Sequence, residues 1–265
     1  MPENPYTAIR TALEHFPPIT LEEMDSIRLM NRIDTKYLTK EETLAQVLDD
    51  AAGAGFMVLE TEGNRNSPYN SVYFDTPWLK TYLDHHNRRL NRHKVRTRIY
   101  EDSGQAFLEV KRKNNKGRTR KKRTPIPASE MMDFSKDGDA TAFLTGHSPF
   151  TPDQISPVLS TAFNRITLVN PSETERITID TSLRFNNFRT GKSASLLDAV
   201  IIEIKQDGRS ESHMKRILLD RRVKPVRVSK YCLAVTLTDR SVKSGRFKQK
   251  VRAMEKIINK RIPVI

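Results

Sequence analysis

Hydrophobic and polar residues alternate with a period of two through much of the chain, which is typical of β-strands that bury one face. The pattern predicts about eight strands, drawn from the segments 31–38, 55–60, 69–76, 89–101, 106–113, 117–126, 157–170, 175–185 and 199–207. The stretch "NNKG" at 114–117 is a turn sequence between two of them. Because most segments follow one another closely, we expect antiparallel neighbours.

A helical period appears between and after these segments, and it predicts helices over 20–30, 39–55, 77–87, 210–222, 229–237 and 247–262. Thr20 is a suitable N-cap for the first of them. Residues 1–20 contain four prolines and are expected to be loosely structured. The expected fold class is α+β. We expect a single domain over 1–265, with a lead-in at 1–27, a strand-rich body at 28–237 and a basic C-terminal helix within 238–265.

Six of the predicted strands repeat one arrangement, with charged side chains on one face and mostly apolar ones on the other. The charged positions are Arg32, Asp34 and Lys36; Lys94, Arg96 and Arg98; Glu109, Lys111 and Lys113; Arg118, Arg120 and Lys122; Arg176 and Asp180; and Glu203 and Lys205. An open antiparallel sheet with one wet face would also show this pattern. The abundance of arginine, with a lone glutamate beside a lysine twice, favours instead a sheet closed into a barrel with these stripes inside.

Composition narrows the choice of partner. The chain carries 46 lysines and arginines against 32 acidic residues, a formal net charge of +14, which predicts a nucleic acid, an anionic membrane or a polyanionic small molecule as partner. Its one cysteine, Cys232, excludes an internal disulfide and a cysteine-based metal site, and we expect it to be buried. The chain shows neither a signal peptide nor an apolar run long enough to span a membrane, so a cytoplasmic location is expected.

The charged stripes suit one kind of ligand. Arginine binds phosphate oxygens through two hydrogen bonds at once and lysine adds a point charge. Sparse carboxylates among them would repel phosphate unless a hard divalent cation bridged the two. This combination predicts a site for a metal–polyphosphate complex, and phosphoryl transfer needs mainly positioning and charge neutralisation of such a complex.

Eight short motifs, taken together, resemble a known family. They are "RIDTKYL", "YNSVYFDTPWLKTY", "RHKVRTRIY", "FLEVKRK", "FNRITL", "RITID", "VIIEIK" and "VSKY". Their order and spacing are similar to those of the VTC domain, the polyphosphate polymerase domain of vacuolar transporter chaperone proteins and their bacterial relatives, from about residue 28 to 237. The resemblance implies a closed antiparallel eight-stranded β-tunnel of the triphosphate tunnel metalloenzyme superfamily. It also implies transfer of the γ-phosphoryl group of ATP to a growing polyphosphate chain.

The resemblance also implies roles for single residues. The expected phosphate ligands are Lys36, Arg96, Arg98, Lys111, Arg165 and Lys230, with Arg89, Arg92, Lys122, Lys205 and Ser229 as further contacts to the bound nucleotide or phosphate chain. Glu203 is the expected main ligand of a divalent metal, Mn²⁺ or Mg²⁺, and Glu109 the second. The expected ligands of the protein are ATP, polyphosphate, triphosphate and pyrophosphate, with no specific nucleic acid.

The chain departs from the family pattern at two positions. Phe163 stands where the family often has a tyrosine, so a hydroxyl contact is lost. The triphosphatases of the wider superfamily begin with Glu-x-Glu-x-Lys, and here that register reads Arg32-x-Asp34-x-Lys36. Fewer carboxylates give weaker support for a second metal that would activate water. This favours phosphoryl transfer, while a tunnel triphosphatase and a non-catalytic polyphosphate- or nucleotide-binding module stay open as alternatives.

The remaining features are less specific. The basic run 111–123 would suit nucleic acid, but no nucleic-acid-binding motif accompanies it. His85 and His86 are expected at the surface and Trp78 in packing. Asp75 is expected either at the tunnel mouth or as a turn cap. The C-terminal basic helix is expected to pack its apolar stripe on the core, with contact to a membrane surface or a partner protein as the alternative.

Overall fold

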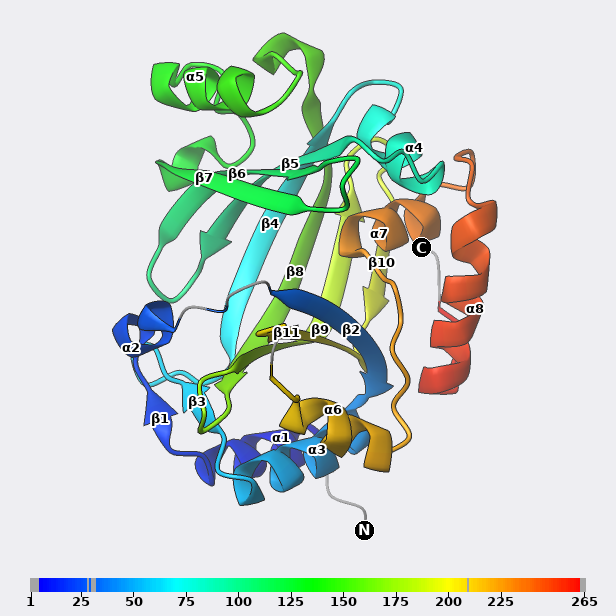
Figure 1. Cartoon of the computed structure of the whole chain (residues 1–265). Helices are drawn as coiled ribbons and strands as arrows, with labels where there is room; N and C mark the ends of the chain where they lie inside the picture. The colour runs from blue at the N-terminus through cyan, green and yellow to red at the C-terminus, as the bar shows by residue number, and fades with distance from the viewer. Residues whose placement is uncertain (1–4, 28, 30–31, 209, 263–265) are drawn as a thin grey trace.

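The computed structural model describes residues 5–27, 29, 32–208 and 210–262, and within them eleven strands form one sheet (Figure 1). The strands are β1 (Pro18–Ile19), β2 (Ile33–Lys40), β3 (Met57–Leu59), β4 (Ser67–Asp75), β5 (Arg92–Tyr100), β6 (Gln105–Lys113), β7 (Thr119–Ile126), β8 (Ser156–Val169), β9 (Glu175–Asn187), β10 (Ser193–Leu196) and β11 (Ala199–Gln206). The predicted first helix (20–30) ends, and the predicted first strand (31–38) begins, in a stretch whose positions 28, 30 and 31 lie outside the described residues.

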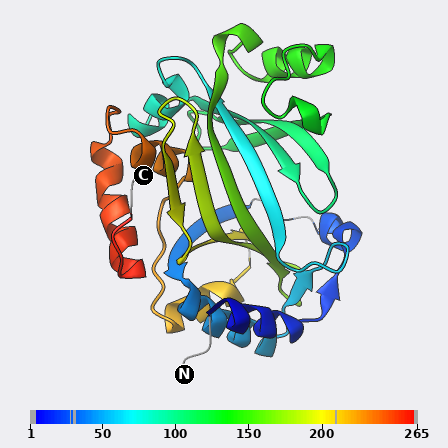
Figure 2. The same cartoon turned by 180° about the vertical axis from the view of Figure 1, so that it is seen from behind.

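Eight of the strands form a continuous antiparallel ladder in the order β2-β11-β9-β8-β4-β5-β6-β7. The sheet curls, so that its two edge strands β2 and β7 lie on the same side of the molecule, opposite the middle strands (Figures 1 and 2). We call the concave side of this sheet the inner face. Off this path, β10 extends the β11 edge of β9, while β3 pairs with β8 and with β1.

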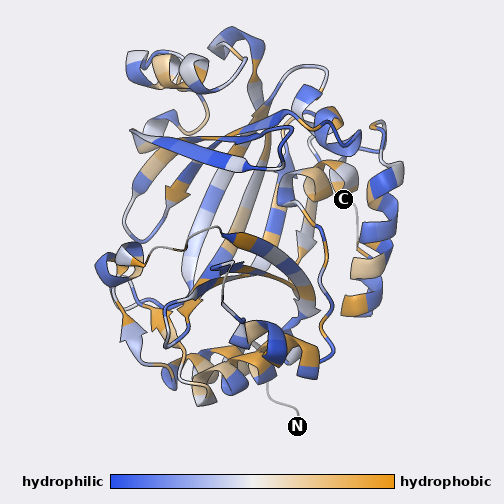
Figure 3. Ribbon diagram, in the orientation of Figure 1, coloured by the Kyte–Doolittle hydropathy of each residue, from blue (hydrophilic) through white to orange (hydrophobic). Residues whose placement is uncertain are grey.

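The prediction of an α+β fold with a large antiparallel sheet is confirmed, but closure into a tunnel by hydrogen bonds is not. Within the part of the chain that the structure describes, the ladder ends at β2 and at β7. Strand β7 is hydrophilic along its length (Figure 3) and carries cations on both faces.

A single residue exchanges the two faces of β9 partway along the strand. Ser182 in β9 has a left-handed backbone conformation (φ 52°), and the pairing with β8 shifts at this place, between Ala162 and Asn164. Before it, Asp180 lies on the inner face; after it, Leu183 and Phe185 do. Because the side-chain period of a strand is two, one extra residue exchanges the faces. The inner face therefore has a charged half and an apolar half.

The helices surround the sheet. They are α1 (Pro5–Glu14), α2 (Leu21–Ser26), α3 (Glu41–Gly53), α4 (Lys80–His86), α5 (Gly138–His147), α6 (His213–Asp220), α7 (Lys230–Thr238) and α8 (Gly245–Ile258), with single 3₁₀ turns η1 (Ala128–Glu130) and η2 (Pro152–Gln154). Thr20 caps α2 through a capping box with Glu23, as its sequence predicts. None of the helices in the described ranges has both the length and the apolar character that crossing a bilayer requires.

Two groups of helices cover the outer face. Below β2, β11 and β9, α1, α3 and α6 form one core in which Leu44, Val47 and Leu48 of α3 are fully buried. Each such side chain contributes about 1.5–3 kcal/mol to folding. The expectation of a loose segment over 1–20 is wrong, since α1 packs Ile9 and Leu13 into this core. Above β4 to β7, α5 and the segment 131–155 cover Leu108 and Val110.

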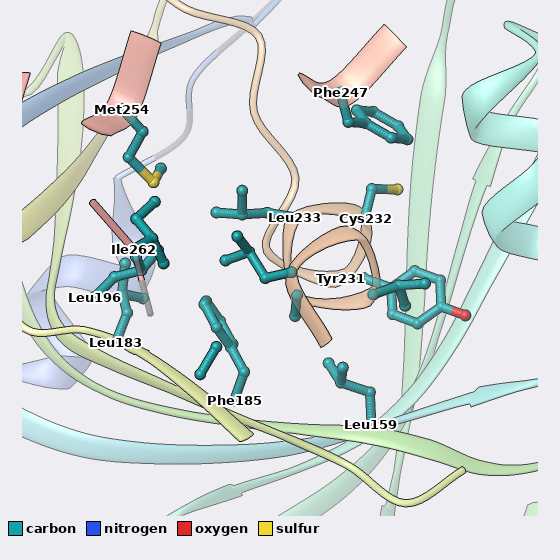
Figure 4. Packing of buried hydrophobic residues seen from close by; sticks show 14 of the residues in the cluster. Leu159, Leu183, Phe185, Leu196, Tyr231, Cys232, Leu233, Phe247, Met254 and Ile262 are labelled. Atoms are coloured by element: carbon teal, nitrogen blue, oxygen red, sulfur yellow. The ribbon is translucent and has the colours of Figure 1, made fainter. Parts of the chain in front are cut away.

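Helix α7 covers the apolar half of the inner face. Tyr231 and Leu233 of α7 pack with Leu159, Leu183 and Phe185 of the sheet (Figure 4). Helix α8 closes over α7 with Phe247, Met254 and Ile258, so the predicted core packing of the C-terminal helix is confirmed. Cys232 is buried here, as expected. The charged half of the inner face is thereby left beside the N-terminus of α7.

Candidate functional site

The charged half of the inner face is built from cross-strand rows on β5, β6 and β7. The first row is Arg98, Phe107 and Pro125, the second is Arg96, Glu109 and Arg123, and the third is Lys94, Lys111 and Lys121. Directly opposed residues in adjacent strands lie about 5 Å apart. The strand pairing therefore collects five or more cations around one acid, Glu109.

Glu109 is buried and held by two cations. Its carboxylate accepts hydrogen bonds from Arg96 Nε at 2.6 Å and from Lys121 Nζ at 2.8 Å. Burial would raise the pKa of Glu109, but the charges of Arg96, Arg98 and Lys121 outweigh it and hold that pKa well below its usual range. Arg96 also donates to the hydroxyl of Tyr73 at 3.1 Å. These bonds fix Arg96 in place on the inner face.

Asp180 on β9, another strand of the same inner face, is held in the same way. Arg165 on β8 donates to it twice, at 2.7 and 3.0 Å, and Lys230, the first residue of α7, forms an ion pair with the same carboxylate. The pKa of Asp180 is held far below its usual range, because these two cations outweigh its burial. The ammonium of Lys230 also lies 4.0 Å from the ring centre of Phe163.

Ser229 caps the helix that carries Lys230. Its hydroxyl accepts from the backbone N–H of Cys232 at 3.4 Å, and Lys94 donates to the same hydroxyl at 2.6 Å. Ser229 thus joins the third row of β5 to the N-terminus of α7, where a positive helix end adds to the local charge. The predicted contribution of Ser229 to phosphate binding stays a prediction.

Glu203 on β11 is the third carboxylate of the inner face. It is the direct cross-strand neighbour of Lys36 on β2, and the two side chains form an ion pair at 3.1 Å. Its pKa is also lowered, because Lys36, Lys205 and Lys111 outweigh the effect of burial. Lys205, two residues further along β11, forms no ion pair with any residue that the structure describes. Burial lowers its pKa to about 8; the charge of Glu203 opposes this shift and Arg165 adds to it.

Arg98 is the most unusual side chain of the inner face. It is 5% exposed, and the one hydrogen bond that its guanidinium makes to the described part of the chain is to Ser71 Oγ at 3.0 Å. Its charge lies 5.4 Å from the ring centre of Tyr69 and 5.7 Å from that of Phe163. Burial, followed by the charges of Arg96 and Arg165, lowers its pKa to about 10. A buried arginine without a carboxylate partner costs several kcal/mol unless an anion compensates it.

The carboxylates of the inner face differ in whether they are available to a metal ion. No group of three or more histidine, cysteine, aspartate or glutamate side chains is placed to hold a metal ion in the described residues. Mg²⁺ and Mn²⁺, however, commonly use one or two carboxylates and take their remaining oxygens from substrate phosphates and water. Glu203, which is 16% exposed and has a single cationic partner, fits this use. Asp180 does not, since its two oxygens are already bonded to Arg165 and Lys230.

The structure brings most of the predicted site residues together. Lys36, Arg96, Arg98, Lys111, Arg165, Lys205, Ser229, Lys230, Glu109 and Glu203 all belong to the inner face or the adjoining start of α7. Arg92 occupies the next row beyond Lys94, opposite Lys113, and donates to the backbone carbonyl of Arg89 at 2.9 Å. Arg89 lies in the exposed loop before β5 and does not join the group.

The expected position of Lys122 is wrong. It pairs with Val110, which belongs to the outer core, whereas Lys121 pairs with Lys111 and bonds Glu109. The assumed alternation of β7 is off by one residue, since Arg118, Arg120 and Lys122 share the outer side. Charged residues stand at consecutive positions here, so the sequence pattern carries no information on which of them face inward.

Sequence reasoning missed several residues of the site. Alternation in "ERITID" places Asp180 on the charged face but assigns it no partner, because its contacts come from β8 and α7. Tyr69, Ser71 and Tyr73 of β4 also face inward, beside Arg98 and Arg96. Their shared parity in the segment 69–76 is a signal that could have found them.

Four further expectations meet the structure here. Asp75 is fully buried and accepts from the backbone N–H groups of Thr81 and Tyr82 and from the hydroxyl of Tyr231, so it is a cap of α4 and a tie to α7. His86 is buried against Phe247, which corrects its expected surface position. His85 is also packed against Phe247, and its Nδ1 lies 3.1 Å from Cys232 Sγ.

The expectation that Trp78 packs in the core is wrong, because its side chain is 82% exposed. The turn that leads into α4 holds the neighbouring Leu79 in a left-handed conformation and buries that side chain in its place. Arg32, at the edge of β2, donates to Asp34 at 2.7 Å, and both side chains are substantially exposed. The one acid left in the Arg-x-Asp-x-Lys register is therefore paired with the arginine that replaces the other.

Several solved structures have a similar fold. A proposed adenylyl cyclase from Hippeastrum with a dominant triphosphatase activity is 12% identical and has a TM-score of 0.52, over 77% of this chain and 95% of that one. Proposed adenylate cyclases from Bacillus halodurans (16% identical, TM-score 0.49, covering 76% of this chain and 96% of that one) and Vibrio parahaemolyticus (12%, 0.45, 76% and 96%) also match. At these identities the likeness concerns the fold alone.

The family follows from the sequence. A model of the VTC domain matches residues 31–238, and the chain belongs to the VTC-domain family. No curated protein matches the chain. The expected resemblance is thereby confirmed over nearly the range that the motifs covered.

Proposed function

We propose that the protein is a metal-dependent polyphosphate polymerase, which transfers the γ-phosphoryl group of ATP to a growing polyphosphate chain on the inner face of the sheet. Family membership and the tunnel fold support a protein of the triphosphate tunnel class. The finer assignment rests on the charges described above. ATP is the donor, polyphosphate, triphosphate or pyrophosphate are the related chain ligands, and Mn²⁺ or Mg²⁺ is the metal.

The observation that carries the proposal is the unpaired, buried Arg98. Its guanidinium has five N–H donors and a single hydrogen-bond partner among the described residues, Ser71. Arg96 and Arg165 are close enough to lower its pKa, so repulsion adds to the cost of burial. A phosphate group would accept two parallel hydrogen bonds from the free donors of Arg98 and would compensate its charge, whereas Arg96 and Arg165 are already paired with Glu109 and Asp180.

The surrounding residues divide the work of phosphoryl transfer among them. Arg96, Arg98 and Arg165 are placed to bind phosphate oxygens, while Lys36, Lys111 and Lys230 supply further charge where it develops during transfer. Glu109 and Asp180 act as fixed counterions that orient Arg96 and Arg165. Glu203 would hold the divalent ion, with Glu109 as the second candidate, and that ion would neutralise charge on the transferred phosphoryl group.

Two alternatives remain within the same site. The Hippeastrum neighbour has a dominant triphosphatase activity, and hydrolysis would use much of the same phosphate-binding surface. The Arg32–Asp34 pair argues for transfer, because it removes an exposed carboxylate that could support a second metal and an activated water. A non-catalytic polyphosphate- or nucleotide-binding module would bind the same ligands and turn over neither.

The test is incubation with ATP and Mn²⁺, followed by separation of phosphate chains on a gel and measurement of orthophosphate. We expect chains longer than triphosphate, with loss of chain synthesis in Arg98→Ala and in Glu203→Ala. Lys122→Ala is the matched control, since it removes a lysine of β7 from the outer side.

Each other outcome decides between the alternatives. Orthophosphate without chains would show a triphosphatase. Binding of ATP and polyphosphate without turnover in Mg²⁺ or Mn²⁺ would show a binding module. Unchanged chain synthesis in both Arg98→Ala and Glu203→Ala would refute the assignment of the site.

A further inference from the structure

Two large apolar side chains project into solvent at the two ends of the short helix α4. Trp78, before the helix, is 82% exposed, and Leu90, after it, is 62% exposed. Their neighbours Leu79 (φ 55°) and Arg88 (φ 58°) both have left-handed backbones. This conformation costs a residue other than glycine about 1–2 kcal/mol. The backbone reversals at the two ends of α4 therefore include one strained residue each, next to Trp78 at one end and two positions before Leu90 at the other.

The two side chains belong to one edge of the molecule. After α4 the chain reverses at Arg88, and the backbone N–H of Arg89 donates to the carbonyl of Asp84 at 2.9 Å. It then returns along the helix, because His93 at the start of β5 lies within electrostatic range of both Asp84 and Lys80. Leu90 lies on this returning segment, and Trp78 lies two residues before Lys80. Figure 1 shows α4 beside the start of β5.

The edge around these side chains is strongly basic. Between residues 78 and 92 the cations are Lys80, Arg88, Arg89 and Arg92, and the single acid, Asp84, is paired with Lys80 at 2.9 Å. The start of α8 continues the surface, since Arg246 donates to the carbonyl of His86 at 3.5 Å. From Arg240 to Arg252 this second segment has six cations and no acid.

We infer that this edge, formed by residues 78–92 and the first turns of α8, is a docking surface for an anionic lipid bilayer. Arginine and lysine side chains are attracted to anionic headgroups, and each contributes about 1 kcal/mol near the surface. Tryptophan is enriched at the boundary between headgroups and acyl chains, and a leucine beside it inserts into the same layer. An inorganic polyanion such as polyphosphate would use the cations but would gain nothing from Trp78 and Leu90, and a nucleic acid would stack its bases on Trp78 but make no use of Leu90.

This inference does not depend on the proposed reaction. Trp78 and Leu90 lie outside the inner face, on the solvent side of α4 and its loop. The bound orientation would place the N-terminal ends of α7 and α8 toward the membrane-facing side of the protein, since His85 contacts Cys232 of α7 and Arg246 contacts His86.

Trp78 is the only tryptophan of the chain, so its fluorescence reports directly on the proposed contact. The whole protein would be mixed with vesicles of phosphatidylcholine alone and with vesicles in which about one third of the lipid is phosphatidylserine. We expect sedimentation with the second kind only, a shift of Trp78 emission to shorter wavelength, and quenching by lipids brominated in the upper acyl chain. Raised salt should weaken the binding.

Three variants sharpen the test. Trp78→Ala and Arg88→Glu should each weaken vesicle binding roughly tenfold, by loss of interfacial contact and of charge attraction. Leu219→Ala is the matched control, because Leu219 is 73% exposed on α6, away from this edge. Trp78→Ala should leave turnover in solution unchanged.

Several results would overturn the inference. Failure to bind anionic vesicles would do so directly. Binding without a change in Trp78 emission would show that the protein adsorbs through another basic surface. An emission shift with soluble polyphosphate but not with vesicles would show a polyanion site instead. A shift that depends on protein concentration without lipid, and is accompanied by a doubled mass, would show that a second copy of the chain covers this edge.

Discussion

Asp180 and Glu203 lie on adjacent strands and on the same face of the sheet, yet they are held in different ways. Asp180 is 3% exposed and receives both an arginine and a lysine, which occupy both of its oxygens. Glu203 is 16% exposed and has one ion pair, to Lys36. Both carboxylates have lowered pKa values, so ionisation alone does not distinguish them. Their partners and their access to solvent do.

The difference teaches how one basic surface can contain both kinds of acid. A buried carboxylate with both oxygens bonded to cations is a permanent counterion, which keeps neighbouring cations buried and oriented. A carboxylate with free lone pairs and access to solvent is available to a cation that arrives with a ligand. Glu109 resembles Asp180 in its burial, but one of its partners, Lys121, is 46% exposed. It is therefore the intermediate case.

The largest expected effect comes from Asp180→Asn. The substitution leaves the cations Arg165 and Lys230 buried without their counterion, which should lower the free energy of unfolding by about 3–5 kcal/mol. Thermal unfolding followed by circular dichroism would measure it, with roughly 2–4 °C of melting temperature lost for each kcal/mol. Glu203→Gln is the control and should cost about 1 kcal/mol. Equal losses in the two variants would remove the distinction between the acids.

The second prediction concerns Glu203, whose substitution should affect activity more than stability. Glu203→Gln should lower metal-dependent turnover by about 100-fold, because the amide is a poor ligand for a divalent ion. The apparent affinity for Mn²⁺ should fall with it, as titration of activity with metal would show. An unaltered metal dependence would contradict the role of Glu203 and direct attention to Glu109.

The third prediction concerns pH and Lys205, the cation next to Glu203 that has no acidic partner in the described structure. Its pKa falls from 10.5 to about 8 on folding, so between these values the unfolded chain binds more protons than the folded one. The free energy of unfolding contributed by this group should therefore rise with pH in that window, while affinity for triphosphate falls as the ammonium loses its proton. Denaturant titrations and binding measurements at pH 7 and 9 would show the two opposite trends.

Lys205→Arg is the check on that assignment. Arginine stays charged throughout this range, so the alkaline loss of triphosphate affinity should become shallower in the variant. If wild type and variant lose affinity in parallel, another group controls the alkaline side.

The smallest expected effect separates two neighbouring lysines of β7. Lys121→Ala removes the exposed partner of Glu109 and should cost about 0.2–1 kcal/mol of stability, whereas Lys122→Ala should cost nothing measurable. The ionic-strength dependence of triphosphate binding should weaken in the first variant and not in the second. A loss in Lys122→Ala but not in Lys121→Ala would show that Lys122 faces inward, as the sequence pattern suggests.

The sequence predicts the fold and most of the site where alternation is clean. On β5, on β11 and on β6 up to Lys111, a β-branched or leucine residue stands between successive charges, so the buried face is defined and Arg96, Arg98, Glu109 and Glu203 fall on the inner side. On β7 the charges are consecutive, and the register depends on pairing with β6. The failure to place Lys122 has this physical cause.

Other features depend on contacts between distant segments, which a local pattern does not contain. The role of Asp180 follows from Arg165 on β8 and Lys230 on α7. Helix α1 becomes stable by packing Ile9 and Leu13 on α3, although its prolines suggest a loose segment. The exposure of Trp78 follows from the left-handed turn at Leu79, which the motif around it does not indicate.

The left-handed residue Ser182 has a consequence for how such a surface could change. Side chains of a β-strand alternate between its two faces, and the extra residue Ser182 reverses this alternation. One strand can therefore face a polar ligand at one end and the apolar helix α7 at the other. Moving the extra residue by two positions along β9 would change how many side chains of this strand face the charged half and how many face α7, and the pairing with β8 would shift with it. On β9 the position of Ser182 thus sets where inward polar side chains give way to those that pack on α7, which offers one place at which the depth of the site can be altered.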